Sequence, residues 1–382
     1  MKISSITAIP LSYPLPKGKT VTMGVGSTLK RDAIVVRVET SSGIVGYGES
    51  HPGRSPGAVV SLIQNTLSPL LVGMSASDVI NVWQRVHRMQ FSGHGLGAGT
   101  ALALSGIDMA LWDIRGKAAN LPLYELLGAS SKRLPAYAGG IALGYQPAQS
   151  LAEEAQSYVE QGYRAVKLRI GDSVKEDIAR CVHVRKTLGD DIDILTDANT
   201  AYSIAQARRV LPMLADIHAG WLEEPFACTD FASYREAAKI TPLVPLAAGE
   251  NHYTRFEFAQ LLEAGAVQVW QPDLSKTGGI TEAIRIAAMA SAYSIPINAH
   301  SSATGLNHAA TLHFLAATEN AGYFEACVSS FNPLRDMFGS TFTIGEDGCV
   351  EPPHGPGLGV EVDEAIFKEF PMIDGPGYVV KF

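Results

Sequence analysis

The pattern of hydrophobic and polar positions changes near residue 130 and divides the chain into two parts. In the first part, strand-like segments at about 2–9, AIVVRVET and IVGYGES precede a helical pattern over about 57–128. The Ser-Ser-Gly turn between AIVVRVET and IVGYGES predicts a β-hairpin. In the helical pattern, apolar residues recur at steps of three and four. Residues 1–130 are therefore predicted to form a small α+β domain.

After residue 131, short apolar strands alternate with amphipathic helical segments. The expected strands end in PAYAGG, AVKLRIG, DILTDAN, GWLEEP, LAAGE, VWQPDLSKTGG, IPINAHSS and GYFEACV. From the second strand onward each carries an ionisable residue at its end, in chain order Lys167, Asp197, Glu223, Glu250, Asp273, His300 and Glu325. Their spacing of 23 to 30 residues suits one strand, one helix and two short loops. This pattern predicts an α/β fold, a (β/α)8-type TIM barrel over residues 131–350.

A closed barrel explains the charged strand ends better than a doubly wound open sheet does. In a barrel, the carboxyl ends of all strands meet at one mouth, where the active site lies. In an open sheet the same ends lie along a line, and nothing requires seven ionisable residues there. The glycine-rich HGLGAG at 94–99 follows no strand, so it supports a dinucleotide-binding fold only weakly. We therefore expect the seven side chains to converge on one site.

The composition narrows the classes of partner. The 382-residue chain has a formal net charge of −8 and no block of basic residues, which argues against nucleic acid as its main partner. No apolar run reaches the roughly 18 residues that would suggest a membrane span. The amino-terminal residues lack the apolar core of a signal peptide, and the four cysteines form no CxxC pair. We expect a cytoplasmic protein that acts on a small molecule.

Three consecutive strand ends supply carboxylates: Asp197, Glu223 and Glu250. Carboxylates that converge in a barrel mouth repel one another unless a cation neutralises them. An all-oxygen ligand set suits Mg²⁺ better than zinc, because no cysteine or histidine cluster accompanies it. The alternative is that Lys167, Arg169 and Lys276 neutralise these acids in internal salt bridges. Glu224 is expected to point away from the site, because successive side chains of a strand alternate.

Asp273 and His300 end two successive strands and are expected to form a dyad. A carboxylate beside an imidazole fixes its tautomer and raises the basicity of the free nitrogen, which makes the histidine a general base near neutral pH. Taken singly, His300 is also compatible with a core histidine and Asp273 with a helix N-cap. Glu325 would close the ring, either as a protonated acid that binds a substrate oxyanion or as the partner of another charge.

Seven motifs together make the chain similar to the mandelate racemase subgroup of the enolase superfamily. In chain order they are ALWDIRGKAANLPLYELLG, VKLRIG, TDAN, WLEEP, GEN, PDLSKTGG and NAHSS. The resemblance implies an N-terminal capping domain over a modified (β/α)7β barrel. It further implies that the carboxyl-terminal segment, residues 351–382, returns to the cap, and that the chain forms a homo-oligomer.

The resemblance also implies roles for the strand-end residues. It assigns Mg²⁺ to the three consecutive carboxylates, the general base to the Asp273–His300 dyad, and a hydrogen bond to the substrate carboxylate to Glu325. The reaction step shared by the family is removal of the proton α to a carboxylate, which gives an enediolate. The substrate is therefore expected to be a small-molecule carboxylate.

One position departs from the racemase pattern of this family. There the second strand carries Lys-x-Lys, whose second lysine is one of two bases, whereas this chain has Lys167 and Arg169. Making an arginine neutral at pH 7 costs roughly 7 kcal/mol, so Arg169 is a poor base and a good clamp for a carboxylate or hydroxyl. Lys167 is expected to bind the substrate carboxylate, which leaves His300 as the strong base.

One base suffices to eliminate a hydroxyl group. The leading hypothesis is therefore a dehydratase that converts an acid sugar, an aldonate or an aldarate, to a 2-keto-3-deoxy acid. The alternative is a racemase or epimerase of a 2-hydroxy acid or an amino-acid-derived carboxylate, with Arg169 or Lys167 as the second base. Candidate substrate-binding residues are His51 after GYGES, Tyr137 on the first barrel strand, Lys19 in the loop KGKTVTMGVGS, and Lys276.

Overall fold

The computed structural model describes residues 1–93, 97–301, 303–339 and 341–380. Near the amino terminus, three antiparallel strands form a sheet in the order β1-β4-β5. They are β1 (Ile3–Pro14), β4 (Lys30–Thr40) and β5 (Val45–Ser50). A turn at 41–43 joins β4 to β5, which confirms the predicted hairpin. Strand β1 is longer than the predicted 2–9 because it pairs with β4 over nearly its whole length.

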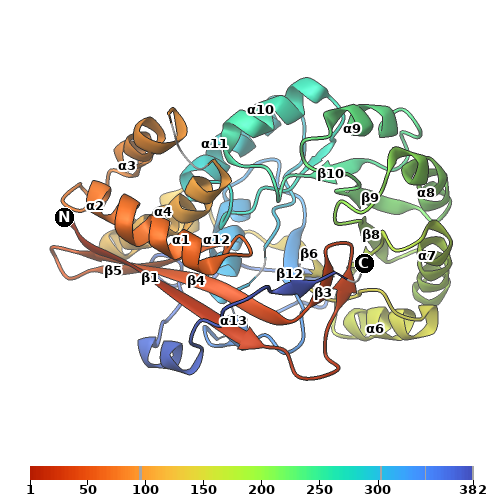
Figure 1. The fold of residues 1–382 in the computed structure, drawn as a ribbon, viewed down its shortest axis with the longest axis horizontal. Helices are drawn as coiled ribbons and strands as arrows, with labels where there is room; N and C mark the ends of the chain where they lie inside the picture. Colours follow the sequence, from red (N-terminus) through yellow and green to blue (C-terminus); the bar gives the residue numbers. More distant parts are fainter. Residues whose placement is uncertain (94–96, 302, 340, 381–382) are drawn as a thin grey trace.

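Helices cover one face of this sheet (Figure 1). They are α1 (Pro56–Leu62), α2 (Ser68–Leu71), α3 (Val79–Val86), α4 (Ala98–Ala119) and α5 (Leu123–Leu126), with π-helical turns at Ile63–Leu67 and His87–Phe91. Helix α4 is buried along most of its length and packs on β5. Gly46 and Gly48 allow this close approach, because a Cβ atom at either position would overlap the backbone of α4. Residues 94–96 of the HGLGAG segment lie outside the described residues.

Seven parallel strands form the wall of the second domain, in the order β11-β10-β9-β8-β7-β6-β12. These strands are β6 (Leu134–Gly139), β7 (Ala165–Arg169), β8 (Asp193–Asp197), β9 (Ala219–Glu223), β10 (Leu246–Ala248), β11 (Val269–Trp270) and β12 (Phe324–Cys327). Helices alternate with them and lie outside the ring (Figure 1): α6 (Ala148–Glu160), α7 (Val174–Leu188), α8 (Ile204–Asp216), α9 (Phe231–Ala237), α10 (Thr254–Ala264), α11 (Ile280–Ser291) and α12 (Gly305–Ala316).

The ring closes through single bridges rather than through an eighth regular strand. Within the described residues, IPINAHSS forms no strand, but Ile297 bridges to Trp270 on one side and to Ala321 on the other. The interior holds a small apolar cluster of Tyr137, Ala165, Leu195, Trp221, Ala247 and Val269. The predicted TIM-barrel fold with an amino-terminal capping domain is confirmed.

Buried polar contacts fasten the cap to the barrel. The Glu49 carboxylate on β5 accepts a hydrogen bond from the Thr304 amide (3.0 Å) and another from its hydroxyl, at the start of α12. Asp108 on α4 accepts hydrogen bonds from the amide (2.9 Å) and hydroxyl (2.6 Å) of Thr281 on α11. These contacts place the cap sheet beside the carboxyl ends of the barrel strands.

The carboxyl-terminal segment runs from the barrel back to the cap. It contains a 3-10 helix (Glu364–Glu369) and β14 (Tyr378–Val379), and it follows α13 (Pro333–Asp336) and β13 (Cys349–Val350). Strand β13 pairs with β6 of the barrel, whereas β14 pairs with β3 (Gly26–Thr28), which pairs with β2 (Thr22–Met23). None of the helices in the described part of the chain is long and apolar enough to cross a membrane.

His313 on α12 joins two of these regions and generates a prediction about pH. Its Nδ1 accepts from the Tyr124 amide (3.2 Å), so its Nε2 donates to the Leu358 carbonyl (3.1 Å), and burial lowers its pKa to about 4. An unfolded histidine has a pKa near 6.5, so the unfolded chain binds the proton first. We therefore expect neutral, buried His313 to contribute fully to the free energy of unfolding above pH 6.5. As the pH falls toward 4, the free energy of unfolding should decrease by up to about 1.4 kcal/mol per pH unit.

Urea unfolding between pH 7.5 and 4.5 measures this dependence. The variant His313→Gln keeps the donor to Leu358 but has no titrating group, so its free energy of unfolding is expected to depend less steeply on pH than that of the native chain. His183→Gln, on the outside of α7, is the control and should leave the slope unchanged. Parallel curves for the native chain and His313→Gln would contradict the assignment.

Candidate active site

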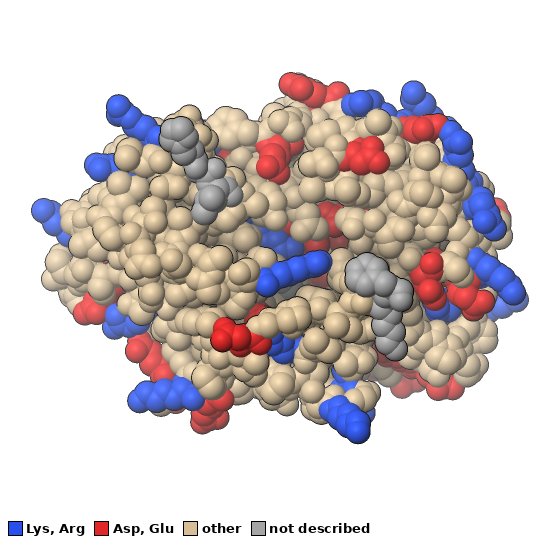
Figure 2. Space-filling view, viewed as in Figure 1, with Lys and Arg blue, Asp and Glu red and all other residues tan. Residues whose placement is uncertain are grey.

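A cavity of about 440 Å³ lies where the cap meets the barrel mouth. Figure 2 shows a hollow near the centre of the face that is turned to the viewer, with basic side chains at the hollow and acidic ones next to them. Among the lining residues are Arg31 and His51 from the cap, Arg169 and Glu250 from barrel strand ends, and Tyr378 from β14. Three parts of the chain that are distant in sequence therefore build this cavity.

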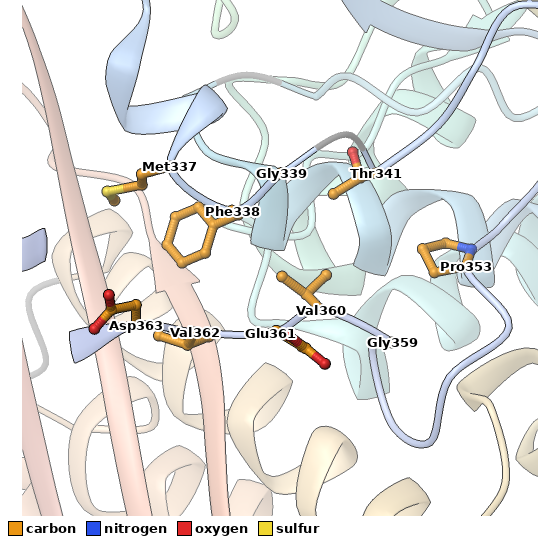
Figure 3. Close-up of a pocket in the computed structure, with 10 residues that line it drawn as sticks. All are labelled: Met337, Phe338, Gly339, Thr341, Pro353, Gly359, Val360, Glu361, Val362 and Asp363. Carbon is orange, nitrogen blue, oxygen red and sulfur yellow. The ribbon is translucent and has the colours of Figure 1, made fainter. Parts of the chain in front are cut away.

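A second cavity, of about 480 Å³, lies between α13 and the carboxyl-terminal segment (Figure 3). Its lining, from Met337 and Phe338 to Val362, is mostly apolar and contains no basic residue or histidine. Of its two carboxylates, Asp363 accepts a hydrogen bond from the Ala365 amide and so caps the 3-10 helix. Chemistry rather than size therefore identifies the first cavity as the candidate active site.

Lys167, on β7, is completely buried among carboxylates and does not itself line the cavity. Its Nζ is 2.9 Å from Glu223 Oε1, 3.1 Å from Glu325 Oε1 and 3.6 Å from Asp197 Oδ2. Burial alone would lower the pKa of Lys167, but the charges of Glu223 and Glu325 raise it well above its usual value. Lys167 therefore remains protonated at neutral pH.

Arg169, two residues later on the same strand, is also held by acceptors. Its Nη1 pairs with Asp197 and donates to Asn199 Oδ1 (3.2 Å), and its Nη2 donates to the Gly140 carbonyl. Burial opposes its charge, but Asp197 and Glu325 raise the pKa of Arg169 above its ordinary value. This placement suits a clamp and not a base.

The three predicted metal-binding carboxylates come from adjacent strand ends. In this structure they form ion pairs with lysine, arginine and histidine side chains. Asp197 and Glu223 face each other in the register of β8 and β9. Besides Lys167, Glu223 accepts hydrogen bonds from Gln271 Nε2 (2.7 Å) and Trp221 Nε1 (3.2 Å). Glu250 lies 3.6 Å from Lys276. The predicted alternative, internal salt bridges, therefore describes the contacts that are present.

The donor set still fits an added cation. Within the described residues, no three acidic, histidine or cysteine side chains are already placed as a metal ligand set. However, among the described side chains of the barrel strand ends, five carboxylates lie within 4 Å of three lysine and arginine side chains and of His300. The carboxylates are Asp197, Glu223, Glu250, Asp273 and Glu325, and the permanent cations are Lys167, Arg169 and Lys276. Burial and the neighbouring Asp197 charge raise the pKa of Glu223 to about 7. This excess of all-oxygen donors is suitable for Mg²⁺.

Asp273 and His300 are hydrogen-bonded, as the strand order predicted. His300 Nδ1 lies 2.6 Å from Asp273 Oδ2, while Asp273 Oδ1 accepts from the amide and hydroxyl of Ser275 (2.8 and 2.7 Å). Burial would lower the pKa of His300, but the charge of Glu250 (Oε2 at 2.6 Å from Nε2) and that of Glu325 raise it well above its usual value. Burial would likewise raise the pKa of Asp273, but its bond to His300 lowers it.

The structure selects one of the two states left open for Glu325, and it differs from the prediction for Glu224. Burial would raise the pKa of Glu325, but Lys167 and His300 lower it to about 2, so Glu325 is the partner of another charge and not a protonated acid. Glu224 lines the cavity instead of pointing away from it. Strand β9 ends at Glu223, and a left-handed backbone at Glu224 (φ 37°) breaks the alternation of side chains.

The four candidate substrate-binding residues divide into two pairs. His51 and Lys276 line the cavity, and the Gly53 amide donates to His51 Nδ1 (3.1 Å), which leaves Nε2 as the protonated nitrogen. Tyr137 does not line the cavity: it is buried in the barrel interior beneath Lys167, whose Nζ lies 5.4 Å from its ring centroid. Lys19 is exposed, lies over the Phe331 ring (5.5 Å) and does not line the cavity.

Sequence reasoning missed several cavity residues: Arg31, Asn199, Asn251 and Tyr378. Asn199 and Asn251 follow the metal-binding candidates by one or two positions, so the motifs TDAN and GEN already contained them. Arg31 is the second residue of β4, the central strand of the cap sheet, and Tyr378 lies in the carboxyl-terminal segment. No local pattern marked these two, because only the folded chain brings them to the barrel.

Family models match both parts of the chain. Residues 6–128 match the mandelate racemase / muconate lactonizing enzyme amino-terminal domain, and residues 150–366 match the enolase carboxyl-terminal domain-like family. Arabinonate dehydratase of Saccharolobus solfataricus is 33% identical over 344 residues, which cover 89% of this chain and 90% of that protein. A 3,6-anhydro-α-L-galactonate cycloisomerase of Streptomyces coelicolor is 33% identical over 341 residues (88% and 91%).

Solved structures agree with these matches. A member of the enolase superfamily from Polaromonas sp. JS666 is 78% identical, with a TM-score of 0.98 and complete coverage of both chains. A racemase from Streptomyces coelicolor A3(2) with bound magnesium is 29% identical, with a TM-score of 0.86 over 96% of this chain and 99% of that chain. The similar proteins thus carry names from three activities: dehydratase, cycloisomerase and racemase.

The position of Lys167 generates a prediction about stability. In Lys167→Met, the buried carboxylates around it lose their shared cation, and breaking a buried ion pair costs about 3–5 kcal/mol. Urea unfolding in the presence of EDTA should show a loss of this size. Lys175→Met, an exposed change on α7, is the control and should stay within about 0.5 kcal/mol of the native chain. Equal stability of the two variants would contradict a central role for Lys167.

Proposed function

Because the chain belongs to the enolase superfamily, in the group of mandelate racemase and muconate lactonizing enzyme, we propose that it is a Mg²⁺-dependent acid-sugar dehydratase. It would convert an aldonate or aldarate to a 2-keto-3-deoxy acid. The observation that carries this proposal is the unequal availability of bases at the barrel mouth. Ion pairs raise the pKa of all three cationic groups in this structure, but they start from different ordinary values. His300, bound to Asp273, is an imidazole with an ordinary pKa of about 6.5, and the pairing with Glu250 that raises it involves a carboxylate that a metal ion would take up. Lys167 and Arg169 have ordinary pKa values above about 10, and their ion pairs raise these further.

Asp197, Glu223 and Glu250 are the residues that would hold Mg²⁺. The excess of buried carboxylates over permanent cations and the raised pKa of Glu223 support this assignment. The ion would supply positive charge beside the substrate carboxylate, which favours loss of the neighbouring proton. Glu250 must leave His300 Nε2 before a substrate reaches that nitrogen, and ligation of an ion by Glu250 is consistent with this.

His300 is the proposed base. Its Nδ1 is fixed by Asp273, so its Nε2 is the nitrogen that faces the cavity and accepts the proton from the carbon α to the carboxylate. The bond between the adjacent carbon and its hydroxyl oxygen then breaks. The hydroxyl leaves as water with the proton now held by His300, and the resulting enol rearranges to the 2-keto-3-deoxy acid. One residue thus serves as base and then as acid.

Lys167 and Arg169 are proposed to bind the substrate carboxylate. Both side chains are cationic and buried at the end of β7, and both already contact carboxylates. A substrate carboxylate replaces part of these contacts at little electrostatic cost, because the groups that bind it are already oriented. A racemase needs a second base on the face of the substrate opposite to the first base. Neither Lys167 nor Arg169 is suited to this role, because ion pairs keep both protonated.

A cycloisomerase is the second candidate, because relatives of similar identity carry that name. The same base would remove the α-proton, but the leaving oxygen would belong to a ring. Racemisation or epimerisation is the third. Reaction in D₂O distinguishes these outcomes: dehydration releases water and forms a keto acid, whereas racemisation incorporates deuterium at the α-carbon of both epimers without loss of water.

The role of His300 is tested by His300→Asn. Keto-acid formation from acid sugars is expected to fall by at least about 10³-fold, since the proton has no other acceptor of suitable pKa. Mg²⁺ binding measured by calorimetry is expected to persist. The control His183→Asn, outside the barrel, should keep full activity. Near-native dehydration by His300→Asn would refute the assignment.

The metal site is tested by removal and substitution. EDTA should abolish activity and added Mg²⁺ should restore it, because the substrate carboxylate then lacks its neutralising charge. Glu223→Gln is expected to weaken Mg²⁺ binding at least about tenfold, and Glu263→Gln, an exposed change on α10, should not. Full activity in EDTA would contradict a metal-dependent reaction.

A further inference from the structure

Several basic residues line the cavity, and most of them have a carboxylate partner. Lys30 lies 3.0 Å from Asp32, Lys276 lies 3.6 Å from Glu250, and Arg169 pairs with Asp197. This pairing is expected, because a buried charge without a counter-charge is destabilising. A basic residue that departs from it needs a separate explanation.

Arg31, the second residue of β4, is such an exception. Its side chain is 8% exposed and lines the cavity from the cap side. Nε donates to the Phe331 carbonyl (3.2 Å) and Nη2 to the Ser330 carbonyl (3.0 Å), but among the described residues Nη1 has no acceptor and no carboxylate pairs with the guanidinium. The cation is therefore buried at the wall of a cavity with one edge free.

No carboxylate is among the described groups that act on the charge of Arg31. Burial lowers the pKa of Arg31 most, and the second guanidinium, Arg335, lowers it further. Cys327, whose own pKa is lowered to about 6 by His308 and Arg335 against the effect of burial, and the Tyr378 phenol raise it. Arg54, also at the cavity, lies over the Tyr378 ring (5.4 Å) and has no carboxylate partner in the described part of the chain. The cap side of the cavity therefore carries one buried guanidinium, Arg31, and one exposed guanidinium, Arg54, and neither has a carboxylate partner among the described residues.

Arg31 could serve only to anchor the loop after β12, because it donates hydrogen bonds to two carbonyl groups there. A neutral donor such as glutamine would serve carbonyl groups without the cost of burying a charge. A guanidinium, in contrast, is well suited to bind a carboxylate through parallel N–H groups. The free Nη1 at the cavity wall favours this second use.

We propose that Arg31, with Arg54 beside Tyr378, binds a carboxylate at the end of the substrate opposite to the reacting carboxylate, so that the enzyme acts on aldarates in preference to aldonates. Lys167 and Arg169 on the barrel bind the reacting end, and Arg31 on the cap binds the distal end. This inference rests on the proposed function, and it makes the cap the part of the molecule that selects diacids.

Matched pairs of substrates test the inference with the Mg²⁺-loaded enzyme. Hexaric and hexonic acids of the same configuration, such as galactarate and galactonate, glucarate and gluconate, or mannarate and mannonate, differ only at the distal carbon. For the pair that the native enzyme accepts, kcat/KM is expected to be higher for the diacid. Arg31→Met should lower it about 100-fold for the diacid and less than about threefold for the monoacid, because only the diacid loses a charged hydrogen bond.

Three further variants separate charge from structure. Arg31→Gln keeps a donor for the loop carbonyls but has no charge, and it is expected to lose the preference as Arg31→Met does. Arg31→Lys keeps a charge and should retain part of the preference for the diacid. Arg37→Met, on the same strand but paired with Glu39 and Glu364 outside the cavity, should leave it unchanged. Equal loss on both substrates in all Arg31 variants would reduce Arg31 to a structural residue and overturn the inference.

Binding without turnover makes the outcomes distinguishable. Calorimetry with His300→Asn and Mg²⁺ should show tighter binding of the diacid than of the monoacid, and adding Arg31→Met should remove this difference. If the native enzyme dehydrates none of these acids, the proposed function fails. If it dehydrates the monoacid as well as or better than the diacid, the function stands and the role of Arg31 is refuted.

Discussion

Charge balance at the barrel mouth is the constraint on which the rest of this structure depends. Lys167 lies between Glu223 and Glu325, with Asp197 close by, and all of these side chains are buried. Removing one of them leaves an uncompensated charge in a region that water does not reach. The described carboxylates of the strand ends outnumber the lysine and arginine side chains that pair with them there, which fits the proposed divalent ion and the proposed binding of an anionic substrate. Stability and chemistry therefore rest on the same groups.

The barrel and the cap contribute different parts of the candidate active site. The barrel positions the reacting groups at its strand ends, with His300 oriented by Asp273. The cap adds the wall that faces them, and it is fastened by buried contacts such as that of Glu49 with Thr304. In the proposed reaction, cap residues would contact the part of a substrate that is remote from the reacting carbon. A change of cap side chain, as at Arg31, would then alter the choice of substrate without touching the proposed base.

Most of the barrel and its reacting groups were predictable because strand and helix alternate with a regular spacing, and the fold brings equivalent strand ends to one mouth. The errors have local physical causes. Glu224 lines the cavity because its backbone leaves the strand conformation at that residue. Tyr137 points to the barrel interior, where it packs beneath Lys167. For Glu325 the sequence left two states open, and the choice of the ionised one depends on its distance to Lys167, which no spacing along the chain specifies.

The sequence by itself determined the class of fold and the strand ends that carry the proposed base, the carboxylates and the cations, because these follow from periodicity and from residue type. Only the tertiary structure decided which charges neutralise one another and which stay unpaired. Arg169 forms an ion pair with Asp197. Arg31 comes more than a hundred residues earlier in the chain and lines the same cavity, but it has no carboxylate partner among the described residues. Electrostatic interactions act through space over a few ångströms, so the distribution of charge in the site exists only once the chain has folded.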